Sequence, residues 1–298
     1  MAYSREHLIH FNKQHDTLVG VDSDGCVFHS MELKQKLCFH GEIIKHFELE
    51  SIAPFVVQAA EFVNLYSQWR GANRFKALLK IFEELAEWTD VVETGVPLPE
   101  LEAIRSFVES GVALSNDTLE DEVKRTGNDV LRRMLAWSEE INRNVREKID
   151  LVPVFPGVRE SLERMHAHSD VFVVSQTPTT TVMHEWGRHD LLQYVQMVAG
   201  PEIGAKAECL ALAMKGRYAR ERVLMIGDAP GDLNAAMEAG ACFYPINPGH
   251  EEASWRRFRE EAYDRFLAGR FDAAYARDLA DEFNALLPET PPWRQNKA

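Results

Sequence analysis

The feature that most constrains the fold is an alternation of short apolar runs with helical patterns in the second half of the chain. β-branched apolar runs of strand length occur at residues 18–21, 171–174, 194–198, 223–226 and 242–246, with a weaker one at 273–275. Helical patterns lie at residues 158–167, 180–190, 206–220, 232–239 and 277–287. Strands that alternate with helices predict an α/β fold whose parallel sheet is covered on both faces.

The stretch from residue 29 to residue 150 interrupts this alternation. Its apolar side chains recur every three or four residues, which is typical of amphipathic helices. Breaks at Gly71, Gly95, Gly111 and Gly127 divide it into five or six helices. We therefore expect an α/β core formed by residues 1–28 and 151–298 and an all-helical domain at 29–150. Residues 288–298 are expected to be a frayed terminus.

Charge and composition exclude several classes of function. The net charge of −14 leaves no concentrated basic surface for nucleic acid. No stretch approaches the ~18 apolar residues of a membrane helix, and the N-terminus lacks a signal-peptide core. Four scattered cysteines indicate reduced thiols. We expect a cytoplasmic monomer or homodimer that binds neither nucleic acid nor membrane. Any phosphorylated ligand would need a cation or local basic groups inside its site.

Polar residues follow the predicted strands where each strand ends. Asp22 and Asp24 come directly after the first strand, and their two-residue spacing points both carboxylates to one side. Gly25 then allows a sharp turn, so ordinary turn chemistry explains this motif equally well. The carboxyl ends of parallel strands are where open α/β sheets bind ligands.

Three further motifs repeat this placement, each with a structural alternative. Ser175 closes the next strand and can donate to a phosphoryl oxygen, or can simply begin a turn. Lys206 opens a helix and supplies a positive charge, unless it is solvated. Asp228 and Asp232 follow the fourth strand at a spacing of four, although Asp232 can also be a helix N-cap.

The order of these motifs is more specific than any one of them. Up to four carboxylates gathered at one edge of a sheet repel one another unless a cation lies among them. Oxygen ligands favour Mg²⁺ over zinc. Magnesium with a lysine and a hydroxyl makes a phosphate site, which supplies the local positive charge that an acidic protein requires.

The motifs as a set resemble those of the haloacid dehalogenase-like hydrolase superfamily. The Asp22-Ser23-Asp24-Gly25 sequence matches the first motif, Ser175 the second, Lys206 the third, and Gly227-Asp228 to Asp232 the fourth. The resemblance covers residues 15–28 and 150–250 and implies a Rossmann-like core. The short separation between Ser175 and Lys206 leaves the helical segment after the first motif as the cap domain.

The resemblance also implies a mechanism for a phosphatase that acts on a small phosphorylated metabolite. Asp22 is expected to be the nucleophile, Asp24 the acid and base, and Ser175 and Lys206 the groups that grip the phosphoryl group. Asp22, Asp228 and the backbone carbonyl of Asp24 are expected to bind magnesium, with Asp232 as an additional acid. A phosphomutase, a phosphonate hydrolase and a non-catalytic phospho-ligand-binding protein remain alternatives.

The sequence also offers four candidate substrate-binding residues. We count Ser23 and Gln176 among them, together with Arg70 and Arg74, which flank the break at Gly71. A solvated turn between helices is the alternative interpretation of the two arginines. Cys26 stands where the superfamily commonly has threonine, and we expect it to pack as a small hydrophobic residue.

Overall fold

A computed structural model describes residues 3–148 and 152–295 of the chain. It divides into two compact units, a core unit of residues 1–31 and 151–286, and a helical unit of residues 32–150 and 287–298. The boundary expected between residues 150 and 151 lies outside the described residues. Residues 287–298, which we had assigned to the core, group with the helical unit instead.

A five-stranded parallel sheet forms the centre of the core unit. Its order is β3-β2-β1-β4-β5, and β1 pairs in register with both neighbours, since Leu18 lies opposite Asp170 and Val223. Side chains of β1, β2, β3 and β4 are buried on both faces, as expected for a sheet covered by helices. The strands are β1 Leu18–Val21, β2 Asp170–Val174, β3 Met197–Ala199, β4 Val223–Gly227 and β5 Cys242–Pro245.

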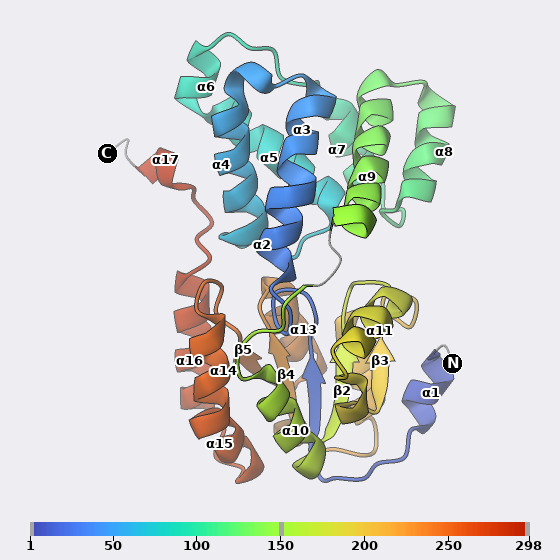
Figure 1. Cartoon of the computed structure of the whole chain (residues 1–298), viewed down its shortest axis with the longest axis vertical. Helices are drawn as coiled ribbons and strands as arrows, with labels where there is room; N and C mark the ends of the chain where they lie inside the picture. The colour runs from blue at the N-terminus through green and yellow to red at the C-terminus, as the bar shows by residue number, and fades with distance from the viewer. Residues whose placement is uncertain (1–2, 149–151, 296–298) are drawn as a thin grey trace. The chain divides into compact units, whose positions relative to one another are not determined.

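Helices cover both faces of this sheet, which confirms the α/β class. In Figure 1, α10 and α11 lie in front of the strands and α13 lies behind them, and α12 packs against α13. Short 3₁₀ helices at Leu192–Tyr194 and Arg220–Arg222 lead into β3 and β4. The helices are α1 Arg5–His10, α10 Val158–His168, α11 Thr179–Arg188, α12 Lys206–Met214 and α13 Pro230–Ala239.

A helical extension follows β5. It comprises α14 Glu251–Arg257, a π-helical segment Phe258–Ala262, α15 Tyr263–Leu267 and α16 Ala273–Ala285, which packs on β5. The weak strand predicted at residues 273–275 was wrong, because these residues begin α16. The Asp272 side chain accepts hydrogen bonds of 3.0 Å from the backbone N–H groups of Ala274 and Tyr275, and this N-cap starts the helix.

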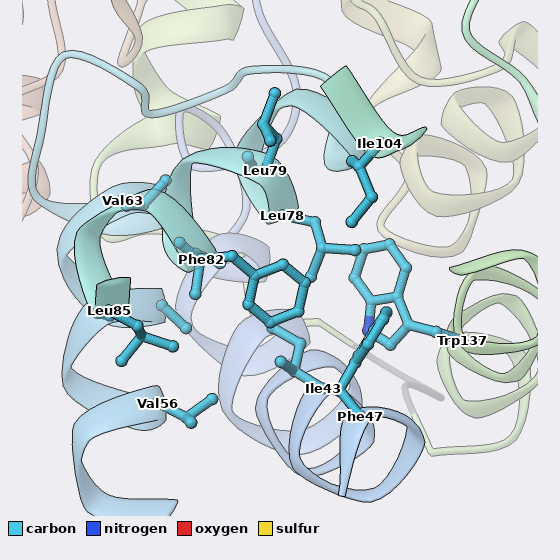
Figure 2. Close-up of a cluster of buried hydrophobic side chains, with 14 of the residues drawn as sticks. Ile43, Phe47, Val56, Val63, Leu78, Leu79, Phe82, Leu85, Ile104 and Trp137 are labelled. Atoms are coloured by element: carbon cyan, nitrogen blue, oxygen red, sulfur yellow. The ribbon is translucent and has the colours of Figure 1, made fainter. Parts of the chain in front are cut away.

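The helical unit contains more helices than the five or six expected. Its own core is built from large apolar side chains, among them Phe47, Phe82 and Trp137, which Figure 2 shows packed together. The expected breaks at Gly71, Gly95, Gly111 and Gly127 all lie at positive φ. Helix α2, Ser30–Lys34, begins in the core unit and ends in the helical unit. The segments that follow it are π-helical Gln35–Phe39, α3 His40–Phe47, 3₁₀ Glu50–Ile52, α4 Ala53–Leu65, α5 Arg74–Glu87, α6 Thr89–Glu93, α7 Leu101–Glu109, α8 Asn116–Thr126 and α9 Asp129–Lys148.

The C-terminal segment is ordered in the helical unit, and the expectation of a frayed terminus was wrong for residues up to 295. Helix α17, Pro292–Gln295, carries Trp293, whose ring stacks on Trp88 with centroids 4.0 Å apart. Arg294 forms ion pairs with Glu84 at 2.8 Å and with Glu87. Aromatic stacking and a guanidinium partner for a buried carboxylate therefore hold this segment.

Across the two described ranges, none of the helices is both long and apolar enough to cross a membrane.

Candidate active site

The candidate site lies at the carboxyl edge of the sheet. Asp22 directly follows β1 and Asp228 directly follows β4, and these neighbouring strands are parallel, so both acids leave the sheet at the same edge. The N–H of Asp22 donates to the carbonyl of Ile226 at 2.9 Å, which extends the pairing of the two strands by one residue. The backbone of Asp22 is therefore fixed by the sheet itself.

Three carboxylates and one ammonium group meet at this edge. Asp22, Asp228 and Asp232 each offer a carboxylate oxygen, and these oxygens lie within 4.8 Å of one another. Lys206 Nζ lies 2.9 Å from Asp22 Oδ1 and 2.5 Å from Asp232 Oδ1. The three acids are 6%, 1% and 0% exposed, so solvent screens this cluster weakly.

Burial and neighbouring charges shift the pKa values of this cluster. Burial raises the pKa of Asp22 well above its usual range; the charge of Lys206 opposes the rise, while those of Asp232 and Asp228 add to it. Burial by itself lowers the pKa of Lys206, but Asp22 and Asp232 outweigh it and the pKa lies above its usual value. The Lys206 ammonium thus bonds to two of the three acids, and its charge favours the ionised form of Asp22 against the effect of burial.

The N-cap of α13 is Ala229, so the prediction that Asp232 can be the N-cap was wrong: Asp232 is the third residue of the helix, and its side chain bonds back to the N-cap residue. Its Oδ1 accepts from Lys206, while its Oδ2 accepts a 3.1 Å hydrogen bond from the N–H of Ala229 at the start of α13. The side chain packs so closely on Gly227 that a Cβ atom there would lie 2.3 Å from Asp232 Cγ. The hydrogen bond from the N-cap residue Ala229 therefore also fixes the carboxylate that bonds to Lys206.

The loop after β1 turns at Gly25, as expected. Gly25 has φ 76°, and its N–H donates to the carbonyl of Phe28 at 3.0 Å. The N–H of Val27 donates to the carbonyl of Ser23 at 2.9 Å, which closes the same turn. These bonds fix the backbone that carries Asp24 just beyond Asp22.

Two indole groups hold this loop from other parts of the core unit. Trp186 of α11 donates from Nε1 to Ser23 Oγ at 3.0 Å, and Trp255 of α14 donates from Nε1 to the Cys26 carbonyl at 2.9 Å. Both rings are fully buried. No local sequence signal predicts these contacts, because the paired residues are far apart in the chain.

Thr177 is a site residue that the sequence analysis missed. Its Oγ1 donates to Asp24 Oδ2 at 2.7 Å, and its N–H donates to Ser175 Oγ at 3.1 Å. Ser175 directly follows β2 and is buried, with its N–H bonded to the carbonyl of Ala199. The only signal in the sequence is a second hydroxyl two residues after Ser175, which a turn explains equally well.

The other predicted substrate-binding residues are placed differently. Ser23 is fully buried and its hydroxyl is bonded to Trp186, while Gln176 is exposed in the turn after β2. Neither belongs to the carboxylate cluster. Substrate contact by Ser23 and Gln176 stays a prediction.

The two arginines make structural contacts within the helical unit. Arg70 is buried and donates to the carbonyl of Leu65 at 2.9 Å. Arg74 Nη1 donates to the carbonyl and the hydroxyl of Ser138 and to Asn142 Oδ1, and burial lowers its pKa to about 10. The solvated-turn interpretation was wrong for both side chains, and substrate contact by them stays a prediction.

The donor set suits a hard divalent cation. Carboxylate oxygens are the ligands that Mg²⁺ prefers, and Asp22, Asp228 and Asp232 present them from a buried cluster. Cys26 is not available as a soft ligand or nucleophile, because burial, followed by the charge of Asp228, raises the pKa of its thiol well above the usual range. The residues present therefore fit magnesium.

Fold and site together define an α/β protein with a lysine and three carboxylates at the carboxyl edge of a parallel sheet. The family model of haloacid dehalogenase-like hydrolases matches residues 72–245, more than half of the chain. The chain belongs to the haloacid dehalogenase-like hydrolase family. The matched residues include Ser175, Lys206, Asp228 and Asp232, and the segment of Asp22 lies outside them.

Solved structures give weaker likenesses. A haloacid dehalogenase-like family hydrolase from Streptococcus pneumoniae is 17% identical, covering 82% of this chain and 91% of its own, with a TM-score of 0.42. A magnesium-bound protein from Bacillus subtilis, proposed to be a HAD-hydrolase, is 13% identical, covering 77% of this chain and 86% of its own, with a TM-score of 0.41. A predicted phosphatase from Clostridium acetobutylicum is 12% identical, covering 78% of this chain and 85% of its own, with a TM-score of 0.39. No curated protein matches the chain. The family assignment therefore rests on the family model.

Proposed function

We propose that the protein is a magnesium-dependent phosphoric monoester hydrolase that acts on a small phosphorylated metabolite through an aspartyl-phosphate. The observation that carries this proposal is the buried cluster in which Lys206 bonds to Asp22 and Asp232 beside Asp228. A nucleophilic carboxylate, a fixed positive charge and a set of oxygen ligands are what transfer of a phosphoryl group requires.

Asp22, Asp228 and the backbone carbonyl of Asp24 are the proposed ligands of the cation. Asp232 supports the site differently, because its two oxygens already hold Lys206 and the N-terminus of α13. Bound magnesium supplies positive charge that neutralises phosphoryl oxygens and offsets the repulsion among the acids. In this arrangement Lys206 and Ser175 bind the remaining phosphoryl oxygens.

The proposed reaction has two chemical steps. A carboxylate oxygen of Asp22 forms a bond to phosphorus while the bond from phosphorus to the ester oxygen breaks, and Asp24 gives its proton to that oxygen. Asp24 then accepts a proton from water, whose oxygen attacks the phosphorus of the aspartyl-phosphate. The second step releases inorganic phosphate and restores Asp22 as a carboxylate.

The helical unit is the proposed cap of this enzyme. It has a hydrophobic core of its own, so it can move as one body. Closure of such a domain excludes water from a reacting phosphate and adds contacts to the substrate. Selection among small phosphorylated metabolites is therefore assigned to the helical unit.

The test is a phosphate-release screen over sugar phosphates, nucleotides and small organic phosphates, with magnesium and with chelator. We expect wild-type protein with magnesium to release phosphate, and Asp22→Asn protein or chelated wild type to release none. Activity that survives the substitution or the chelator contradicts the mechanism. Turnover of only a phosphonate or a phosphosugar isomer changes the reaction class, and tight binding of a phosphorylated ligand without turnover identifies a binding protein.

A further inference from the structure

We propose that Thr177 is a positioning residue for Asp24. Its hydroxyl fixes the Asp24 carboxylate in the orientation that delivers a proton to the leaving oxygen. This inference rests on the proposed function, since it assigns Asp24 the role of acid and base. Nothing in the reaction requires Thr177 to touch the substrate.

The contact joins two loops at the carboxyl edge of the core unit. Thr177 Oγ1 donates to Asp24 Oδ2 at 2.7 Å, the length of a strong hydrogen bond to a carboxylate. Asp24 follows β1 and Thr177 follows β2, and these strands are neighbours in the sheet. The hydroxyl therefore links the loop after β1, which carries Asp22 and Asp24, to the turn that contains Ser175.

The turn that presents Thr177 is anchored at both ends. On one side, Ser175 is buried and accepts the Thr177 N–H at 3.1 Å. On the other side, Thr179 donates from Oγ1 to Glu202 at 3.0 Å and accepts from the N–H of Gly200 at 3.2 Å. Pro178 between them has a restricted φ. Thr177 is thus a donor fixed in space, unlike a side chain on a mobile loop.

A fixed donor matters because the Asp24 side chain has two rotatable bonds and must aim one oxygen at the ester. A hydrogen bond to Oδ2 restricts both rotations and so holds the carboxylate in one orientation. General acid catalysis depends on such alignment. Loss of the Thr177 hydroxyl should therefore weaken proton delivery without removing the acid.

Esters with different leaving groups measure this effect directly. An aryl phosphate such as p-nitrophenyl phosphate leaves without full protonation, whereas an alkyl phosphate needs the acid. We expect Thr177→Val to lower kcat/KM for an alkyl phosphate about 10²-fold, at the lower end of what a general acid contributes, and kcat/KM for p-nitrophenyl phosphate less than about 10-fold. This ratio reports only the steps up to release of the leaving group, so it excludes hydrolysis of the aspartyl-phosphate, which is the same for every ester. Thr177→Ser retains the hydroxyl and should restore the alkyl rate.

Thr179→Val is the matched control, because it removes a threonine hydroxyl from the same turn that bonds to Glu202 instead of Asp24. It should change the alkyl and aryl rates by the same factor. If Thr177→Val lowers kcat/KM for both esters equally, or if Thr177→Ser does not recover kcat/KM for the alkyl phosphate, Thr177 is only structural and the proposal is overturned.

A crystal structure of the Thr177→Val protein separates this proposal from the proposed function. We expect the Asp24 carboxylate to rotate away from its wild-type position while Asp22 and Lys206 keep theirs. An Asp24 carboxylate that stays in place overturns the positioning role, whether or not any ester is cleaved. A wild-type protein that cleaves no ester contradicts the proposed function alone.

Discussion

The indole N–H of Trp255 donates a 2.9 Å hydrogen bond to the carbonyl oxygen of Cys26, 229 positions earlier in the chain. Cys26 ends the loop that carries Asp22 and Asp24, and Trp255 belongs to the helical extension after β5. The extension thus does more than cover the edge strand. It fixes the backbone of this loop from outside the motifs that define the family.

Trp255→Phe tests this relationship. The substitution keeps an aromatic ring beside Phe258 but leaves the Cys26 carbonyl buried without its donor, which costs about 1–3 kcal/mol of unfolding free energy. We expect a lower kcat as well, because the loop that holds Asp22 loses a fixed point. Denaturant unfolding and steady-state kinetics measure the two effects.

Trp137→Phe provides the comparison, since Trp137 is equally buried, and its Nε1 has no hydrogen-bond partner among the described residues. It removes the same atoms without breaking a bond. Equal losses of stability in both variants, with kcat unchanged in Trp255→Phe, would show that the indole bond has no effect on the loop.

Gly227→Ala should damage the site through a steric clash. A Cβ at this position would lie 2.3 Å from Asp232 Cγ, so the Asp232 carboxylate must move away from Lys206 and Ala229. Overpacking of this kind costs about 1–3 kcal/mol. Gly231→Ala, four residues later in α13, meets no atom within 4 Å and should be neutral or stabilising by about 0.4–1 kcal/mol. Thermal unfolding of both variants decides between these outcomes, and a Gly227→Ala protein as stable as wild type refutes the clash.

Magnesium should stabilise the folded protein through its two proposed carboxylate ligands, Asp22 and Asp228. At a free concentration 100 times its dissociation constant, a ligand that binds only the folded state adds about 2.7 kcal/mol to the unfolding free energy. We expect this gain in wild type and none in Asp228→Asn, as measured by the Tm with and without magnesium. Asp16→Asn removes an exposed acid of the core unit and should retain the gain. A Tm that magnesium raises equally in Asp228→Asn would place the cation elsewhere.

His40 should make the stability of the helical unit depend on pH. Burial, followed by the charge of Lys36, lowers the pKa of His40 to about 4, from a usual value near 6.5. The unfolded chain therefore binds a proton at a pH where the folded protein does not. The contribution of His40 to the unfolding free energy is about 3 kcal/mol. It is fully present above pH 6.5 and is lost as the pH falls towards 4.

Unfolding free energies measured from pH 7 to pH 4 test this dependence. His40→Asn should reduce the loss of stability on acidification, whatever its effect at neutral pH. The same substitution at His168, which is exposed, should leave the loss at its wild-type size. An unchanged pH dependence in His40→Asn would show that other groups cause the acid destabilisation.

The sequence was sufficient to predict the residues that each strand brings to the edge of the sheet. Asp22 and Asp228 each follow an apolar run directly, so the parallel pairing of β1 with β4 brings them together. Lys206 begins α12 as expected, and its contacts with two acids follow from that position. For these residues, position relative to the end of a strand or the start of a helix was enough to predict their place in the site.

Contacts between distant segments could not be predicted in this way. Trp186 and Trp255 looked like ordinary core residues, because their partners Ser23 and Cys26 are more than a hundred positions away. Arg74 stood beside a glycine break, and the sequence did not reveal that Ser138 on another helix would bind it. The partners of these side chains depend on packing between distant segments, which local sequence patterns do not reveal.

The position of Trp293 against Trp88 has a practical consequence for domain engineering. The helical unit is composed of two stretches of chain, one inserted after β1 and the other at the C-terminal end. It cannot be transplanted as a single cassette, because a graft of residues 32–150 alone would expose the Trp88 ring face and leave buried Glu84 without Arg294. Chimaeras that exchange substrate specificity between related hydrolases must therefore carry both stretches, and affinity tags are better placed at the N-terminus.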